Sequence, residues 1–234
     1  MIITEDRELR GQMLDILKTE YALEGGRTGI HVSDLTHCLT RTYWDKTDPQ
    51  PLSDTEVGLF SIGWGMERSM ISRMHVEPFE VDGITMSLDF RLPDGTIADL
   101  KTTRLSPRGR KDQDGFQMPE GWLRQFAAYR YGWNALSERE VTYPKLALER
   151  PAYDFGVVVV HLIQPEITCW RVEWTPQELN NAWADLQDRA NALESMLNSN
   201  DPQPYQHRLG DWECTGCSRA LACGLAASLK AIGK

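Results

Sequence analysis

The sequence has 234 residues, of which 41% are hydrophobic and 25% are charged, and its net charge is −9. This length and composition allow one large domain with a substantial core, and the negative charge argues against a protein that coats nucleic acid through bulk attraction. The chain has no apolar run near the ~20 residues of a membrane span and no signal-peptide pattern, so we expect a soluble, cytoplasmic protein without a membrane partner.

The first third of the chain predicts three helices. Residues 5–22 have a helix-forming composition with an apolar stripe made of Leu9, Met13, Ile16 and Leu17. After the helix-breaking run "EGGRTG", Ser33 is expected to cap a short helix that carries Leu35, Cys38 and Leu39. A polar loop over 46–55 then precedes a third helix over 56–74.

Strands and two longer helices follow. Strands are predicted over 76–103 and again over 156–163 and 167–174, and Pro119 opens a helix between the two groups. Thr175 and Glu178 form a capping box at the start of the clearest helix, 175–197. Residues 199–213 then link that helix to a cysteine-containing tail. This order of elements predicts an α/β core with a small C-terminal appendage.

One predicted hairpin carries a pair of acids. Apolar and polar residues alternate from Thr85 to Leu92, and a turn at Pro93-Asp94-Gly95 leads into "TIADLKTT". Asp89 and Asp99 are equally far from the turn, so they face each other at about 4.5–5.5 Å between Cβ atoms. We expect Asp99 and Lys101 to point outward and Leu100 to point into the core.

The acid pair has two interpretations. It is either an exposed surface cluster with an ordinary salt bridge, or a site for a hard divalent cation beside a lysine. A cation such as Mg²⁺ relieves the repulsion between facing carboxylates and activates a bound water. The stretch 101–111 is the most basic in the sequence and starts at this lysine; it is either a solvated loop or a set of phosphate contacts. Its basic residues are Lys101, Arg104, Arg108, Arg110 and Lys111.

The cysteines are unevenly placed. Cys214, Cys217 and Cys223 crowd into ten residues, whereas Cys38 lies far upstream. Together the four predict a thiolate metal site, and their spacing alone leaves zinc and an iron–sulfur cluster both open. Cys169 is expected to be a small core or strand residue, and the histidines have no ligand spacing.

The hairpin acids resemble the core of the PD-(D/E)XK nucleases, with Asp89 followed by the triplet Asp99-Leu100-Lys101. Downstream, Gln125 and Tyr129 match the QxxxY motif of the RecB-like branch of that family. The resemblance implies that Asp89, Asp99 and the Leu100 carbonyl hold Mg²⁺ or Mn²⁺. It also implies that Lys101 and Gln125 position the attacking water and that Tyr129 contacts the DNA strand.

The upstream metal-ligand motif of that branch is altered here. The family has Gly-x-x-x-His, and this chain has Gly63 followed by Glu67 in the histidine's place. Glutamate is also a ligand for hard cations, so we expect Glu67 to complete the metal site. The proline of the family name is replaced by Leu88.

The cysteine arrangement resembles that of the iron–sulfur nucleases, namely the CRISPR-associated exonucleases of the fourth Cas family and the AddB nuclease domain. The resemblance implies a [4Fe–4S] cluster held by Cys38, Cys214, Cys217 and Cys223. It implies a single nuclease domain over 1–234, with a restriction-endonuclease-like core over 56–198 and a cluster-binding subdomain over 24–55 and 199–234.

The implied activity is hydrolysis of DNA phosphodiester bonds. The expected substrate is single-stranded DNA, degraded 5′ to 3′, with Arg104, Arg108, Arg110 and Lys111 on the phosphates. The expected setting is the trimming of CRISPR spacer precursors beside the Cas integrase, or DNA recombination in a phage or its host. Two alternatives stay open: a nuclease-inactive DNA-binding or adaptor protein with the same fold and cluster, and a zinc-stapled structural protein with an incidental acidic hairpin.

Overall fold

The computed structural model describes residues 7–24, 28–71, 74–108, 116–138, 153–204, 206–215, 217–224 and 227. The chain divides into two compact units: Met1–Thr28 with Gln50–Arg73, and Gly29–Pro49 with Met74–Lys234. Within the described ranges, no helix combines the length and the apolar character that a membrane span requires.

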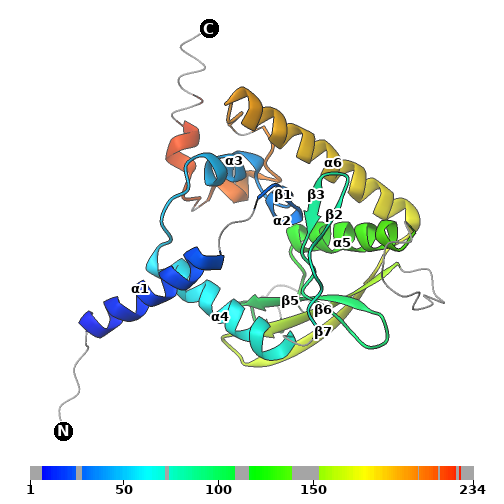
Figure 1. Ribbon diagram of the computed structural model, residues 1–234, viewed down its shortest axis with the longest axis horizontal. Helices are drawn as coiled ribbons and strands as arrows, with labels where there is room; N and C mark the ends of the chain where they lie inside the picture. Colours follow the sequence, from blue (N-terminus) through cyan, green and yellow to red (C-terminus); the bar gives the residue numbers. More distant parts are fainter. Residues whose placement is uncertain are drawn as a thin grey trace. The chain divides into compact units, whose positions relative to one another are not determined.

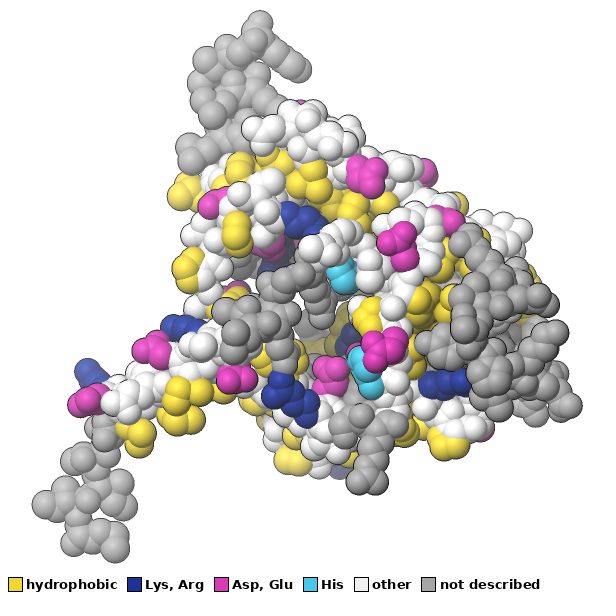
Figure 2. Space-filling model, viewed as in Figure 1, with side chains coloured by type: hydrophobic (Ala, Val, Ile, Leu, Met, Phe, Trp, Pro, Cys, Tyr) yellow, Lys and Arg dark blue, Asp and Glu magenta, His cyan; other side chains and the backbone are white. Residues whose placement is uncertain are grey.

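The first unit is a pair of helices, α1 (Arg7–Glu24) and α4 (Asp54–Ile71). Asp54 at the start of α4 joins them, because its carboxylate pairs with Lys18 and Arg10 at 3.1 Å each. The predicted stripe of α1 is largely uncovered: Leu9, Met13 and Ile16 are exposed, and hydrophobic side chains follow one side of this helix in Figure 2.

The second unit contains two sheets. In the smaller one, β1 (Ile30–His31) pairs parallel and β2 (Phe79–Val81) pairs antiparallel with the central strand β3 (Ile84–Met86). Asp82 and Gly83 form the turn between β2 and β3, both at positive φ, which suits a tight two-residue hairpin. The larger sheet has the order β4 (Phe90–Arg91), β5 (Ile97–Thr103), β6 (Asp154–His161) and β7 (Glu166–Glu173).

One long helix covers the larger sheet, and a second one packs on that helix. β5 and β6 run parallel, and α5 (Glu120–Glu138) crosses between them, as parallel neighbours require. α5 lies between this sheet and α6 (Pro176–Ser199), giving this unit three layers (Figure 1). The core between sheet and helix contains Phe126 and Tyr129 of α5 and Phe155 of β6.

The capping prediction for α6 is confirmed. Thr175 Oγ1 accepts from the backbone N–H of Glu178 at 3.2 Å, and the Glu178 carboxylate accepts from the backbone N–H of Thr175 at 2.7 Å. The helix ends at Asn200, whose left-handed backbone suits a C-terminal cap. The α/β class is likewise confirmed, with mixed sheets flanked by helices.

Two local predictions are wrong. The helix expected around Cys38 is two short helices, α2 (Val32–Leu35) and α3 (Leu39–Thr47); Cys38 is the residue before α3, and His31 rather than Ser33 precedes α2. The run from Thr85 to Leu92 is not one strand, because it is interrupted between β3 and β4 and these strands belong to different sheets. Both Met86 and Phe90 are nevertheless buried as the alternation predicts.

Candidate active site and cysteine cavity

The acid pair lies where the spacing predicts. β4 pairs with β5 through Phe90 opposite Ala98, which brings the preceding Asp89 opposite Asp99. Asp89 Oδ2 accepts from the Leu100 backbone N–H at 2.7 Å. Since two facing carboxylates repel each other, a shared proton, the Lys101 ammonium or a bound cation would stabilise the pair.

Asp99 is more buried than the sequence predicts. Its side chain is 1% exposed because α5 covers this face of the sheet, so the expectation that it points outward to solvent is wrong. Burial raises the pKa of the Asp99 carboxyl, against the opposing effects of Lys101 and of the hydrogen bond with Asp89. Leu100 on the other face is also buried, so both faces of β5 are covered here.

Lys101 contacts the acid directly. Its Nζ lies 2.7 Å from Asp99 Oδ2 and 5.6 Å from the centre of the Phe126 ring. This ion pair does not form a hydrogen bond of regular geometry, so the buried Oδ2 atom has none within the described residues. A buried carboxylate oxygen in that state suits a hard cation, whose preferred ligands are carboxylate and carbonyl oxygens.

Gln125 and Tyr129 share one face of α5, as their spacing predicts. The Gln125 side-chain amide donates to the Tyr129 hydroxyl at 2.9 Å. The Tyr129 ring is 3% exposed and packs beside Phe155, so the expected direct contact of this ring with a DNA strand does not fit the structure. Tyr129 instead supports the side chain of Gln125.

The remaining predicted residues are spread over other segments. Glu67 lies on α4, in the other unit, and its part in the metal site stays a prediction. Arg104 and Arg108 are exposed on the loop that follows β5. Arg110 and Lys111 lie outside the described residues.

All four predicted cysteine ligands line one cavity of about 80 Å³. Cys38 comes from the loop before α3, Cys214 ends the short helix η1 (Asp211–Cys214), and Cys217 and Cys223 follow it. Burial, together with the neighbouring thiols, raises the pKa of Cys223. Among the described residues, no three His, Cys, Asp or Glu side chains are close enough to hold one metal ion. The four thiols therefore line a cavity and do not converge on one ion position.

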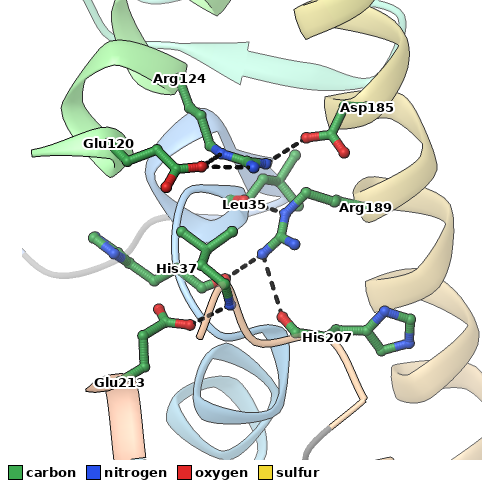
Figure 3. Close-up of polar contacts among 9 residues, drawn as sticks. Leu35, His37, Glu120, Arg124, Asp185, Arg189, His207 and Glu213 are labelled. Atoms are coloured by element: carbon green, nitrogen blue, oxygen red, sulfur yellow. Dashed lines mark hydrogen bonds and ion pairs between the residues drawn. The ribbon is translucent and has the colours of Figure 1, made fainter. Parts of the chain in front are cut away.

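Side chains that the sequence did not single out bring the cysteine segments together. Arg189 of α6 donates to the backbone carbonyls of Leu35, His37 and His207, as Figure 3 shows. Glu213 accepts from the Cys38 N–H at 2.9 Å and from the Leu209 N–H at 2.5 Å.

A second arginine fixes the tail itself. Arg219, 5% exposed, pairs with Asp45 at 3.0 Å and donates to the carbonyls of Trp44 and Asp48. These long-range partners have no signal in a single sequence, because an arginine far along the chain has no periodic relation to the carbonyls it binds.

Cys169 differs from the other four cysteines. It lies on β7 as expected for a strand residue, but it is exposed rather than part of the core. β7 is the last strand of its sheet among the described residues, and most of its side chains are exposed.

No protein-family model matches the sequence, and no curated protein matches it either. The chain is similar in fold to the crystal structure of SSO0001, with a TM-score of 0.55 over 91% of this chain and 94% of that one. Their sequences are 15% identical, so the likeness concerns the fold alone.

Proposed function

We propose that this protein is a metal-dependent nuclease of the PD-(D/E)XK type that cleaves single-stranded DNA. The observation that carries the proposal is that the half-buried Asp89 faces the buried Asp99 across β4 and β5, with Lys101 Nζ 2.7 Å from Asp99 Oδ2. A buried acid that faces a second acid is unfavourable for the fold unless a ligand compensates it, which supports a functional reason for its presence.

Each residue has a distinct part in the proposed reaction. Asp89, Asp99 and the Leu100 carbonyl hold Mg²⁺ or Mn²⁺, and Glu67 completes the set. When bound, the cation stabilises negative charge on the phosphate and lowers the pKa of a water. Lys101, whose Nζ lies 2.7 Å from Asp99 Oδ2, orients the nucleophile. Arg104 and Arg108 contact the phosphates of the strand.

The four cysteines hold a [4Fe–4S] cluster in this proposal. Their position around one cavity of about 80 Å³ supports a shared metal centre, and the resemblance of their spacing to that of the iron–sulfur nucleases favours a [4Fe–4S] cluster over a single zinc ion. The cluster links the segment before α3 to the C-terminal segment. Visible absorption of protein purified without oxygen tests this assignment, because an iron–sulfur cluster is coloured and zinc is not.

A cleavage assay tests the activity. Single-stranded DNA labelled at the 5′ or the 3′ end is incubated with Mn²⁺ or with EDTA, and wild type is compared with Lys101→Met. We expect products in Mn²⁺ but not in EDTA, with nucleotides released first from the 5′ end. The Lys101→Met variant is expected to lose cleavage and to keep the circular dichroism spectrum of wild type. Manganese-dependent cleavage that survives Lys101→Met overturns the site assignment.

A second candidate function is favoured by one residue. Glu67 replaces the histidine of the family motif, which supports a nuclease-inactive DNA-binding or adaptor protein with the same cluster. Binding of DNA without cleavage in any divalent metal favours this candidate. Either function fits a setting beside the Cas integrase or in phage and host recombination.

A further inference from the structure

The exposed residue Trp170 on β7 is in register with the proposed catalytic residue Asp99 on β5, with β6 between the two strands. Asp99 on β5 pairs with Val157 on β6, and Val157 pairs with Trp170 on β7. Residues paired in register point to the same face, so Trp170 and Asp99 share the face that α5 covers. Two strand spacings separate their Cα atoms by about 10 Å.

A chain of hydrogen bonds holds this indole in place. The Trp170 Nε1–H donates to Thr168 Oγ1 at 3.0 Å, and Thr168 Oγ1 lies 3.0 Å from His161 Nε2. His161 Nδ1 lies 2.8 Å from the Leu105 carbonyl. Because a carbonyl only accepts, Nδ1 carries a proton and donates to Leu105, while Nε2 and the Thr168 hydroxyl are hydrogen-bonded to each other. The His161 side chain is buried, which makes this chain of bonds rigid.

Aromatic neighbours support the same ring. Phe116 lies 6.1 Å from Trp170 between ring centres, 6.2 Å from Trp122 and 5.3 Å from His161. Phe116 is buried, whereas Trp170 is 40% exposed. An aromatic ring that is both fixed and exposed is unusual for packing alone, since its position is determined while a large part of its surface faces solvent.

Positive charge lies on the loop that these bonds anchor. His161 binds the Leu105 carbonyl, and Ser106 donates to Gln164 at 2.9 Å, so the loop after β5 is tied to the end of β6. Arg104 and Arg108 are exposed on that loop. Cationic groups on a loop that is tied, through His161 and Thr168, to an exposed aromatic ring provide the combination that binds single-stranded nucleic acid.

We propose that Trp170 is a stacking platform for one base of single-stranded DNA, next to the nucleotide at Asp99, while Arg104 and Arg108 hold the flanking phosphates. This inference rests on the proposed function for the identity of its ligand. It makes Trp170 a residue that selects an unpaired base, because a base within a duplex already stacks on its neighbours and cannot stack on the indole.

Equilibrium binding tests the platform apart from cleavage. A short labelled oligothymidylate is titrated with the full chain in EDTA, and fluorescence anisotropy is measured. Base stacking predicts that Trp170→Ala weakens binding by about 5- to 100-fold and that Trp170→Phe keeps most of the affinity. Ile167→Ala is the matched control: Ile167 is an exposed apolar residue of β7, and its odd spacing from Trp170 puts it on the opposite face.

An abasic scan identifies the base. The same oligonucleotide is made with one base missing at each position in turn. At one position, wild type is expected to bind as weakly as Trp170→Ala, while Trp170→Ala is insensitive to that loss. Equal affinities of wild type and Trp170→Ala overturn the inference, as does an equal loss in Ile167→Ala.

The outcomes separate this inference from the proposed function. Manganese-dependent cleavage with no effect of Trp170→Ala on binding removes the platform and leaves the nuclease. Trp170-dependent binding without cleavage in Mn²⁺ removes the nuclease and leaves a single-strand binding site. Wild type that binds no single-stranded DNA overturns the platform whatever the cleavage assay shows.

Discussion

Asp99→Asn tests the burial of this acid without a cleavage assay. Burial raises the pKa of this carboxyl, so the folded protein binds its proton more tightly than the unfolded chain does. The resulting stabilisation is complete below the ordinary pKa of 3.8 and is lost as the pH rises through the raised pKa of the folded state. Asparagine does not ionise, so the metal-free variant becomes more stable relative to wild type as the pH rises.

The magnitude follows from the environment of Asp99. Its Oδ2 atom is buried without a regular hydrogen bond, a state that costs about 1–3 kcal/mol, and the contact with Lys101 Nζ at 2.7 Å offsets part of that cost. Asparagine keeps a polar atom at that place, so we expect a net gain of about 1 kcal/mol at mildly alkaline pH, or roughly 2–4 °C in Tm for a chain of this size. Mn²⁺ at ~100 times its Kd stabilises wild type by about 2.7 kcal/mol, or roughly 5–11 °C.

Thermal unfolding over a pH series, with and without Mn²⁺, measures both effects. Asp94→Asn is the control, because a backbone hydrogen bond from Thr96 lowers the pKa of this exposed turn residue, which gives the pH trend the opposite sign. Parallel pH curves for wild type and Asp99→Asn refute the burial argument. An equal rise in Tm with Mn²⁺ in both proteins refutes the metal site.

Three further predictions address the rest of the site. Cys217→Ser is expected to lose the visible absorption of the cluster and to lower the Tm. Cys169→Ser, outside the cavity, is expected to keep the absorption and the Tm of wild type, and equal spectra in the two variants contradict the cluster assignment. Glu67→His is expected to retain manganese-dependent cleavage and Glu67→Ala to lose it, and equal rates in the two variants remove Glu67 from the site. Arg219→Met removes donors to two carbonyls and is expected to lower the free energy of unfolding in urea by about 2 kcal/mol, and an unchanged midpoint argues against this anchor.

Local signals predicted the parts of the fold that depend on neighbouring residues. The capping box of α6 and the turn between β6 and β7 each depend on a few neighbouring residues, and both are present in the structure. The facing of Asp89 and Asp99 was predictable because a short turn fixes the register of its two strands.

Long-range features were not predictable in the same way. The polar and apolar alternation from Thr85 to Leu92 is the same whether these residues form one strand or two. The pattern therefore could not predict that β3 and β4 belong to different sheets. The burial of Asp99 depends on α5, and the row from Asp99 to Trp170 depends on pairing across three strands. The cysteine spacing predicted a shared site, but Arg189 and Arg219, which hold its segments together, became visible only in the folded chain.

The cavity also has a consequence for how the protein is made. Cys38 is synthesised early, but its three companions follow α6, after both sheets are complete. A ribosome adds residues from the N-terminus, and domains begin to fold as they emerge. The nascent chain therefore carries Cys38 without its three companions through most of translation. A message cut short before Cys214 yields a polypeptide with every described strand but without the three later cysteines of the cavity.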